Sequence, residues 1–560
     1  MTKFSRCYKA FAFTSLSLAL ADADTSFAQA VPDAGQIMRE LRQTNPAGPR
    51  SLSPAAPPEK EQESSGNDIR ITVTKFEIEG NKSISTDDLQ NVLTDQLGRQ
   101  LSLSDLKNAA SRLTALYRER GFLVARAYLP VQDVQGGKIK ILILEGNIAQ
   151  LQLRNTSSLS DERAQAFLNQ AVAGDAIRSD QIDRALLLLN DVPGVGAVRA
   201  TLQPGASVGS SDLVVDVEPG QRVAGNIGVD NYGSRYTGEK RLSGVLYINN
   251  LLGIGDQTVV SGLLSDRKLG YGRAGYSFPI GGSGLRLGTF VSSTRYELAR
   301  EFAVLDAHGT AKNLNIYATY PLVRTQRANL TTSASIEARR LSDRIDAIGT
   351  VNDKKARTFG LGLSGSYRDD LGGGGLSNFD VSTTFGKLAI ESPVALAIDS
   401  LSAKTNGAYR KVFITGNRLQ RISDNDSLWL ALSAQWASKN LDSSEKFVLG
   451  GASGVRAYPQ GEGIGDQGYL ASVEYRHNFS EALQAALFYD TGSVSVNREV
   501  FDSAASNKRT LSGMGLGFNA VLGGADLRAS LAWRTTGEPL SVPSGSSKSP
   551  TLWLRANKPF

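Results

Sequence analysis

The most constraining feature of the sequence is an alternation of apolar and polar residues that begins near Arg222 and continues to the C-terminus. Four segments show it most clearly: 359–367, 428–436, 469–475 and 527–533. A period of two is typical of β-strands that present one apolar and one polar face. Helical spacing is absent here, so about 340 of the 560 residues are predicted to form β-sheet.

Two architectures are compatible with this alternation: a soluble β-sandwich and an outer-membrane β-barrel. No run of 18 apolar residues occurs, so no transmembrane helix is expected. Several strands place Arg, Glu or Asp on one face and large apolar groups with Tyr or Trp on the other. Lipid outside a barrel and water inside it explain this division, so we predict an all-β transmembrane barrel over 221–560, with roughly 16 antiparallel strands. A lumen of that width holds water.

The N-terminal segment 1–30 is predicted to be a secretory signal peptide. Lys3, Arg6 and Lys9 precede an apolar stretch, and Ala28-Gln29-Ala30 fits a small-x-small cleavage site. The one cysteine lies in this segment, so the mature chain is expected to carry none, which suits an oxidising compartment. A cytosolic protein with an apolar first helix is the alternative interpretation.

A short helix and a linker are predicted next. Residues 31–45 place Ile37 and Leu41 on one helical face, and the charged residues Arg39, Glu40 and Arg42 are expected in solvent. Residues 46–68 hold five prolines among Ser, Glu and Lys, which is typical of an extended linker.

Two α+β modules of similar design are predicted over 69–146 and 147–220. Each follows the order β-α-α-β-β, with helical spacing of apolar residues between the strands. In the first module, strands are expected at 71–78, 123–130 and 138–145, and the second helix at about 104–120. In the second module, strands are expected near 148–153, 198–203 and 212–218, and helices near 160–172 and 179–190.

The residue census argues against several classes of chemistry. The sequence has two histidines, His308 and His477, and one cysteine, Cys7, which are too few for an imidazole or thiolate metal site. We therefore expect no metal, no other cofactor and no enzymatic activity. No GxxxxGK[ST] motif is present, so no nucleotide-binding loop is predicted. The net charge of +6 is dispersed without blocks of like charge, so nucleic acid is not expected as a partner.

The most informative motifs lie near the C-terminus. Val455-Arg456-Ala457-Tyr458 stands in a glycine-rich segment that is predicted to be a long loop between strands. Phe488-x-Asp490-x-Gly492 lies in a strand whose alternate residues are apolar, so Phe488, Asp490 and Gly492 are expected to point into the lumen. A lone lumenal carboxylate is unremarkable, but a loop arginine that folds inward is a candidate partner for Asp490.

With these motifs, the chain resembles the two-partner secretion transporters (TpsB) of the haemolysin secretion and activation family. The modules resemble polypeptide-transport-associated (POTRA) domains. Three further segments near the first barrel strands resemble that family: 230–233, 249–256 and 276–279. Ala457 stands where the family usually has Gly, which would strain the loop if that position required a positive φ.

The resemblance implies roles for particular residues. Arg456 would pair with Asp490, an interaction worth about 0–1 kcal/mol in a wet lumen, and would fix the position of the loop. The helix over 31–45, with Ile37 and Leu41, would plug the lumen. An unfolded polypeptide would add a strand beside an apolar groove of the first POTRA domain. The candidate residues for this groove, which could instead be core residues, are Leu116, Tyr117, Phe122, Val124, Ala127 and Leu129.

The implied function is an outer-membrane pore of a Gram-negative bacterium, with its POTRA domains in the periplasm. It would secrete, and could activate, a large β-helical exoprotein such as a TpsA-like haemolysin or adhesin. Without nucleotide hydrolysis, folding of the exoprotein outside the cell would draw the chain through. Outer-membrane lipid and the barrel-assembly machinery, which would read the C-terminal Phe560, are the other implied partners. The competing interpretations are an outer-membrane protein insertase, a diffusion porin and a secreted enzyme.

Overall fold

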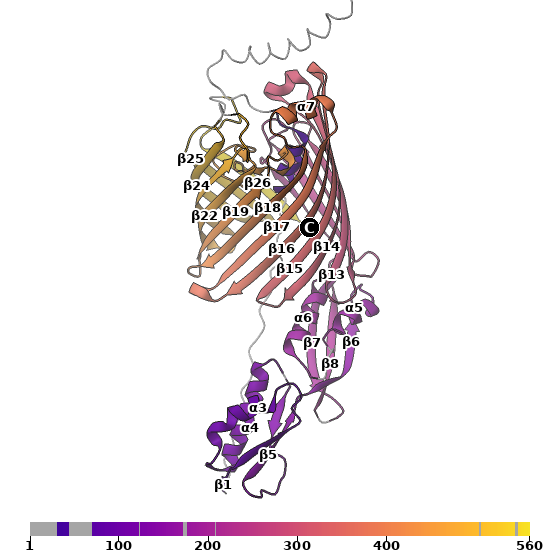
Figure 1. The fold of residues 1–560 in the computed structure, drawn as a ribbon, viewed down its shortest axis with the longest axis vertical. Helices are drawn as coiled ribbons and strands as arrows, with labels where there is room; N and C mark the ends of the chain where they lie inside the picture. Colours follow the sequence, from indigo (N-terminus) through magenta and orange to yellow (C-terminus); the bar gives the residue numbers. More distant parts are fainter. Residues whose placement is uncertain are drawn as a thin grey trace, which may run out of the picture.

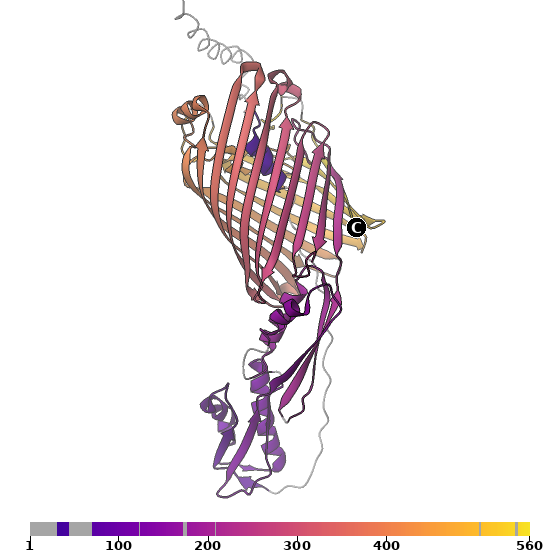
Figure 2. The same cartoon turned by 90° about the vertical axis from the view of Figure 1, so that its right-hand side faces the viewer.

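The computed structural model describes residues 31–43, 70–122, 124–171, 176–207, 209–502, 506–543 and 547–560. The predicted signal peptide (1–30) and linker (46–68) lie outside these residues. A tilted-strand barrel stands above two small modules that follow one another along the chain (Figures 1 and 2). We call the barrel end next to the modules the module end and the opposite end the loop end.

Sixteen antiparallel strands close the barrel, which confirms the predicted fold and strand number. The last strand pairs with the first, so the sheet has no free edge. The barrel strands are β9 (Val223–Asp230), β10 (Arg241–Asn249), β11 (Gln257–Ser265), β12 (Gly270–Ile280), β13 (Leu285–Glu297), β14 (Ala307–Arg324), β15 (Ala328–Ile345), β16 (Thr350–Asp369), β17 (Gly375–Ile390), β18 (Gly407–Arg421), β19 (Asp426–Ala437), β22 (Gln467–Ser480), β23 (Leu483–Ser495), β24 (Lys508–Leu522), β25 (Ala525–Arg534) and β26 (Thr551–Pro559).

The alternation of the sequence becomes the two faces of the barrel wall. Large apolar side chains such as Leu314, Ile336 and Phe359 are exposed on the outer face. Residues of the opposite parity, such as Arg339 and Asp490, point inward and are buried. The apolar exterior and polar interior are the arrangement that lipid and water impose on a transmembrane barrel.

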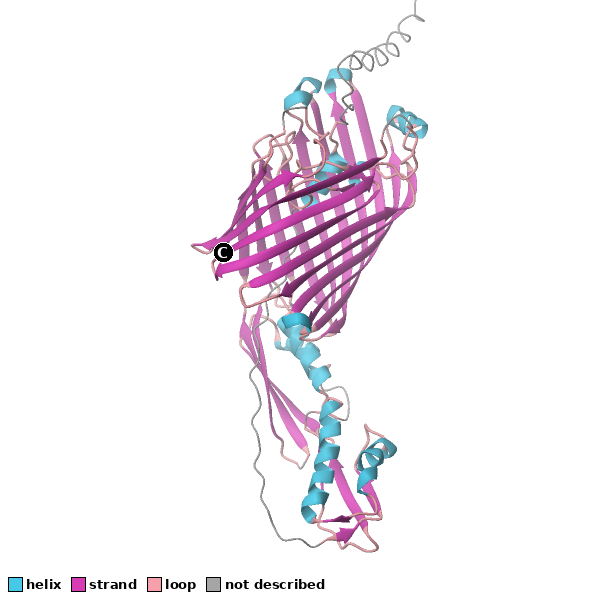
Figure 3. Cartoon of the chain, turned by 90° about the vertical axis from the view of Figure 1, so that its left-hand side faces the viewer, coloured by secondary structure: helices cyan, strands magenta, loops and turns pink. Residues whose placement is uncertain are grey.

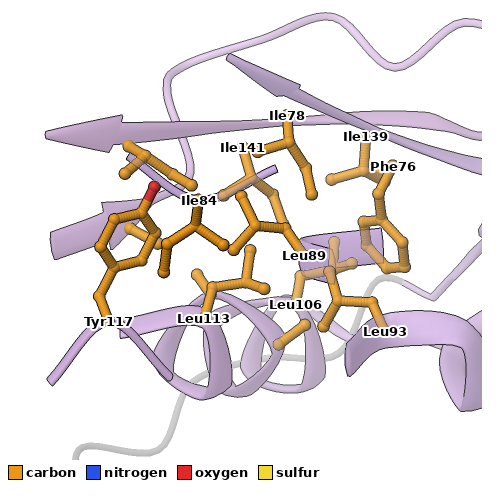
Figure 4. Packing of buried hydrophobic residues seen from close by; sticks show 14 of the residues in the cluster. Phe76, Ile78, Ile84, Leu89, Leu93, Leu106, Leu113, Tyr117, Ile139 and Ile141 are labelled. Atoms are coloured by element: carbon orange, nitrogen blue, oxygen red, sulfur yellow. The ribbon is translucent and has the colours of Figure 1, made fainter. Parts of the chain in front are cut away.

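The first module follows the predicted order of strands and helices. Its three-stranded sheet has the order β2-β5-β4, and α3 and α4 cover one face (Figure 3). Its elements are β1 (Ile71–Thr72), β2 (Lys75–Glu79), α3 (Thr86–Leu93), η1 (Thr94–Gln96), β3 (Gln100–Leu101), α4 (Leu103–Glu119), β4 (Arg126–Tyr128) and β5 (Lys138–Leu144). Phe76, Leu89 and Leu113 pack between helices and sheet (Figure 4).

One strand of this module is shorter than predicted. Residues 123–130 were expected to form a strand, whereas β4 covers only Arg126–Tyr128, and residue 123 lies outside the described residues. The backbone N–H of Ala127 donates to the Thr114 hydroxyl of α4 at 3.0 Å instead of remaining free for another strand. The edge that we expected to accept a substrate strand is therefore short and partly occupied by the module's own helix.

The second module repeats the design and docks on the barrel. Its sheet has the order β6-β8-β7. Arg324 at the module end of β14 forms a bidentate ion pair with Asp191 at 2.7 and 2.8 Å, and the Asn250 side chain donates to the Ser158 hydroxyl at 2.9 Å. The elements are β6 (Asn147–Asn155), α5 (Asp161–Leu168), α6 (Ser179–Asn190), β7 (Val195–Pro204) and β8 (Ser210–Pro219).

The remaining helices lie in the barrel or its loops. Helix α2 (Ala34–Gln43) lies inside the barrel toward the loop end, where it is indigo in Figure 2. No helix in the described ranges is both long and apolar enough to span a membrane. The other elements of the loops are η2 (Arg300–Leu305), η3 (Asp346–Ile348), η4 (Leu371–Gly373), α7 (Pro393–Leu401), η5 (Ser443–Glu445), β20 (Phe447–Val448) and β21 (Ile464–Gly465).

Candidate functional site in the barrel lumen

A long loop between β19 and β22 folds into the lumen; we call residues 438–466 the inward loop. Its two short strands β20 and β21 pair with each other, and Gly450 N–H donates to the Glu462 carbonyl at 2.8 Å. Gly492 on the wall permits close contact, because a Cβ there would lie 2.7 Å from Leu449 of the loop. The glycine-rich segment therefore forms a compact hairpin that packs on the barrel wall.

Arg456 at the tip of this loop is bound on several sides. Its Nε and Nη2 donate to the two oxygens of Asp490 at 2.8 Å each, and its Nη1 donates to Glu474 at 3.0 Å. The guanidinium carbon lies 3.3 Å from the centroid of the Phe488 ring, a cation–π contact. The structure thus brings together the loop motif and the wall motif that the sequence singled out.

The surroundings of this ion pair differ from the wet lumen that we expected. The side chain of Asp490 is 1% exposed and that of Arg456 is 15% exposed. Ser472 donates a further hydrogen bond to Asp490 at 2.6 Å. The premise of a solvent-exposed pair worth about 0–1 kcal/mol therefore does not hold here, and loss of one partner of such a buried pair costs about 3–5 kcal/mol.

The neighbours of Arg456 in the motif anchor the loop through packing and polar contacts. Val455, Ala457 and Tyr458 are fully buried. The Tyr458 hydroxyl donates to the Gly537 carbonyl at 3.0 Å. Ala457 packs on Gly513, and it is not among the described residues with positive φ, so Ala at this position introduces no backbone strain.

Helix α2 lies between the inward loop and strands β13–β15. Ile37 and Leu41 pack in an apolar cluster with Tyr296 and Leu341 of the wall. The Ser443 hydroxyl of the loop donates to Asp33 just before the helix, at 2.6 Å. The first helical N–H, of Ala34, donates to Asp343 of β15 at 2.8 Å. The helix is therefore bound to both the loop and the wall.

A cluster of charged residues joins the loop, the wall and the region of α2. Glu445 of η5 contacts Arg339 of β15, and Lys411 of β18 lies 2.6 Å from the same carboxylate. Lys354 of β16 contacts Asp442 at 2.8 Å and Asp33 at 3.3 Å. Each wall cation is thus paired with a carboxylate of the loop or of the segment before α2.

Two charged residues of α2 lie elsewhere than expected. Arg39 and Glu40 were predicted in solvent, but they are buried, at 8% and 6% exposure. The Glu40 carboxylate accepts a hydrogen bond from Gln36 at 3.0 Å, and Arg39 lines a lumenal cavity together with Glu445. Burial arises because the inward loop covers the helix face that a free amphipathic helix would expose. The side chain of Arg42 lies outside the described residues.

The inward loop and α2 occupy much of the lumen that was expected to hold water. The described residues line two lumenal cavities, of 530 and 410 Å³. Ser453 and Gly454 of the inward loop contribute to both cavities. The space that the described residues enclose is therefore divided by the loop.

The predicted substrate residues of the first module belong largely to its core. Tyr117, Phe122 and Ala127 are buried, which favours the core alternative for these three. Leu116 and Leu129 are half-buried and pack against the same core, and Val124 packs at the junction with the second module. The Tyr117 hydroxyl donates to Glu145 at 2.8 Å, so Tyr117 also stabilises the module internally.

Burial and hydrogen bonding act on the pKa of this pair in the module. Burial, together with the hydrogen bond to Glu145, raises the pKa of Tyr117. Burial alone would raise the pKa of Glu145, but hydrogen bonds from the N–H groups of Ser83 and Lys82 and from two hydroxyls lower it below its ordinary value. The Glu145 carboxylate is therefore charged and fully hydrogen-bonded at neutral pH.

Some residues of the lumenal site were not anticipated. Asp33, Arg339, Lys354 and Glu445 form the charged cluster, but nothing in the sequence links positions so far apart. The inward direction of Arg339 and Lys354 could have been read from the parity of their strands. Among the described residues, no group of three or more His, Cys, Asp or Glu side chains could hold a metal ion.

Comparison with known proteins gives family matches over most of the chain. Residues 209–520 match the family described as haemolysin secretion/activation protein ShlB/FhaC/HecB, and residues 71–146 match the POTRA domain of ShlB type. This is a family of secretion transporters and not of enzymes. The alternative of an outer-membrane protein insertase is accordingly not favoured.

Curated relatives and solved structures agree with these matches. The chain is 31% identical to the heme/hemopexin transporter protein HuxB of Haemophilus influenzae strain 86-028NP, over 98% of both chains. It is 23% identical to the outer membrane transporter CdiB of Escherichia coli, over 81% of this chain and 76% of CdiB. The solved structure of CdiB from Escherichia coli superimposes with a TM-score of 0.71 at 19% identity, covering 99% of this chain and 98% of that one.

Proposed function

The chain belongs to the haemolysin secretion/activation family ShlB/FhaC/HecB, the two-partner secretion transporters of the outer membrane, and from this membership we propose how its lumen passes an exoprotein. The POTRA modules lie in the periplasm, so the module end faces the periplasm and the loop end faces the outside. Helix α2 and the inward loop close the lumen at rest. They leave it when an unfolded exoprotein enters from the periplasm.

The contacts of α2 support this role as a plug. The helix is only ten residues long, and besides the apolar packing of Ile37 and Leu41 it is held by hydrogen bonds and ion pairs around Asp33, such as the 2.6 Å bond from Ser443. Water entering the lumen with a polypeptide competes for such polar contacts more effectively than for an apolar core. The proline-rich composition of 46–68 gives the helix a tether of sufficient length to leave and return.

The polypeptide requires an aqueous route because lipid cannot satisfy its backbone groups. We propose that it first adds a strand to the edge of the second module, at β7. This strand has ten residues and pairs only with β8 within the described ranges. It begins beside the barrel, where Gly194 packs on Asn250 of a module-end turn. A strand added to β7 would therefore run directly to the barrel mouth.

The mature chain lacks cysteine if the signal peptide is removed, so cross-linking can test this edge cleanly. Thr201→Cys on β7 should form a disulfide with an exoprotein that is stalled during export, when single cysteines are placed one at a time along the exoprotein. Tyr128→Cys on the short edge β4 is the matched control and should form little of this disulfide-linked product. Efficient cross-linking at position 128 and none at 201 would show that the first module binds the substrate.

The exported partner is proposed to be a large secreted β-helical exoprotein of the TpsA type. Its folding outside the cell draws the chain through the barrel, because no nucleotide-binding motif is present to supply energy. The HuxB relatives, which are 29–31% identical to this chain, are named heme/hemopexin transporters, which favours an exoprotein that binds haem or haemopexin. Loss of one such exoprotein from the medium of a strain lacking this chain, with other barrels assembled normally, would separate secretion from insertase activity.

Insertion of the barrel itself is proposed to depend on its C-terminus. Phe560 exchanges two backbone hydrogen bonds with Gly225 of β9 at 3.0 Å, and its side chain is exposed. An exposed terminal aromatic residue suits recognition by the barrel-assembly machinery before the barrel closes. Phe560→Ala should lower the amount of inserted barrel without changing secretion per inserted molecule.

The plug proposal is tested by deletion of residues 31–45. Ion conductance in planar bilayers should rise several-fold, because the helix no longer fills part of the lumen. Substitution of Ile37 by Ala is the milder variant and should raise the frequency of open events. Unchanged conductance after the deletion would show that the inward loop alone closes the pore.

A further inference from the structure

The outer face of strands β14–β17 carries five cations, which we call the basic belt: Lys312, Arg340, Lys355, Arg357 and Lys387. Their outward direction follows from the parity of their strands. Leu314, Ile336 and Phe359 have the same parity in β14, β15 and β16, and all three are exposed on the lipid-facing side. The belt therefore lies on the exterior of the barrel and not in the lumen.

The cations of the belt face one another across neighbouring strands. Arg340 stands directly opposite Lys312 of β14 and also directly opposite Lys355 of β16. Arg357 stands directly opposite Lys387 of β17. Side chains at such positions have Cβ atoms about 4.5–5.5 Å apart, and like charges there repel each other. The arrangement is unfavourable unless an anion lies between the cations.

The protein itself supplies little compensation for this charge. Within the described ranges, Lys355 contacts Glu391 at 2.6 Å, and this is the one ion pair of the belt. Lys312, Arg340, Arg357 and Lys387 have no carboxylate within 4 Å among the described residues. The belt is therefore a set of exposed cations that an external anion can bind.

The belt lies at the boundary between the apolar band and the loop end. Toward the module end, the next outward residues include Leu314 after Lys312, Phe359 after Arg357 and Phe385 before Lys387. Because the loop end faces the outside, this boundary lies at the level of the outer-leaflet headgroups. Lysine and arginine are tolerated on the lipid face near such an interface far better than at the bilayer centre.

A hollow on the barrel wall adjoins the belt. It has a volume of 880 Å³, and Lys312, Arg340, Lys355 and Arg357 are among the residues that line it. Its other outward residues are mostly small or aliphatic and follow the register from strand to strand: Val260, Ala274, Val291, Leu314 and Ala338. Small residues beside a row of cations leave room for an acyl chain below a phosphate group.

We propose that the basic belt and this hollow bind the phosphorylated glycolipid of the outer leaflet, lipopolysaccharide. Its phosphates lie between Lys312, Arg340 and Lys355, where they convert the repulsion between facing cations into charge-assisted hydrogen bonds. Its acyl chains lie along the aliphatic row of the hollow. The proposal rests on the location of the barrel in the outer membrane and not on how the pore is gated.

The test measures lipid binding to the purified full-length barrel in detergent. The wild type, the triple variant Lys312→Gln/Arg340→Gln/Lys355→Gln and a charge-matched control are titrated with fluorescent lipopolysaccharide. The control, Lys268→Gln/Arg327→Gln/Arg421→Gln, removes three exposed cations away from the belt. We expect the belt variant to bind at least tenfold more weakly, and the control to bind within twofold of the wild type.

Two further measurements keep the proposal falsifiable if the triple variant folds poorly. Wild-type binding should weaken strongly when the salt concentration rises from 50 to 500 mM, since salt screens phosphate contacts. Enzymatically dephosphorylated lipopolysaccharide should bind the wild type no better than intact lipid binds the belt variant. Equal binding of both lipids by the wild type, or unchanged binding by a correctly folded belt variant, would overturn the proposal. A belt variant that changes only the oligomeric state would instead indicate contact between two copies of the chain.

Discussion

The inner and outer faces of strands β15 and β16 carry neighbouring cations with opposite surroundings. Arg339 and Lys354 point inward, and each contacts carboxylates of the inward loop or of the segment before α2. Arg340 and Lys355, the next residues along the chain, point outward and face each other across the two strands. The chain supplies partners for the inner pair and, apart from Glu391, none for the outer pair in the described ranges.

This contrast separates the two roles that we propose for the two faces of one alternating sequence. Inward charges are desolvated by the loop and the helix, so each needs a partner. We propose that these pairs together hold the closed state of the lumen. Outward charges lie at the membrane interface, where they remain exposed and can bind an external anion. Single substitutions at neighbouring positions can therefore test the proposed gate and the proposed lipid-binding surface independently.

The largest effect is expected at the tip of the inward loop. Arg456→Ala leaves Asp490 buried without its cation, so the loop loses its fixed position while the barrel still inserts. Secretion of the exoprotein should fall at least tenfold. The measured quantity is the amount of exoprotein in the culture medium, divided by the amount of barrel inserted in the outer membrane. Arg476→Ala is the matched control, since Arg476 also contacts Glu474 but lies on the wall. Normal secretion by the Arg456 variant would remove the loop from the mechanism.

The next effect compares the stability of two adjacent variants. Arg339→Gln removes one partner of a buried cluster, which costs about 3–5 kcal/mol, whereas Arg340→Gln changes the stability by about 0.5 kcal/mol or less, as surface substitutions do. The midpoint of thermal unfolding, followed by the mobility shift of the folded barrel in gels, should fall clearly for the first variant only. A similar fall in both would mean that the two faces are coupled.

A smaller effect is expected for the closed state of the pore. Lys354→Gln weakens the contacts to Asp442 and Asp33, so α2 should leave the lumen more often. The adjacent Lys355→Gln leaves these contacts intact. Single-channel recordings should show more frequent openings, by a few-fold, for the first variant and wild-type frequency for the second. Equal opening frequencies would contradict the role of the inner cluster in holding α2.

The smallest effect concerns a buried carboxylate that is held by neutral donors and not by cations. The folded-state pKa of Glu145 lies below its ordinary value of 4.5, so its contribution to stability is present above that pH and is lost as the pH falls through the folded-state pKa. The protection factor of the amides around Ser83, which is the intrinsic exchange rate divided by the observed rate at the same pH, should therefore fall as the pH drops below about 4.5 in the wild type. Glu145→Gln should show the lower protection factor already at pH 7, with little further change in protection as the pH falls.

The sequence was sufficient for the architecture because alternation is a local signal. The parity of Leu487 and Tyr489 placed Asp490 inside the barrel, and the total length set the number of strands. The inference from parity depends on residues only a few positions apart, and the strand number depends only on the length of the alternating region.

The rest of the site depends on contacts that no local pattern encodes. Asp33 and Ser443 are 410 residues apart and meet only because the inward loop and α2 share the lumen. The burial of Arg39 and Glu40 has the same cause, since an amphipathic pattern says nothing about what covers the polar face. The length of β4 was overestimated, and the hydrogen bond from its Ala127 N–H to the Thr114 hydroxyl joins residues of different elements that no local pattern links.

The most direct test of the central claim is a reversible lock between α2 and the inward loop. The side chains of Asp33 and Ser443 are in contact, so Asp33→Cys/Ser443→Cys should form a disulfide in a chain that holds no other cysteine once the predicted signal peptide with Cys7 is removed. Secretion is then measured with and without reductant, beside each single variant. Our account predicts that secretion stops when the disulfide is formed and recovers when it is reduced. Secretion at the rate of the single variants with the disulfide intact would contradict it.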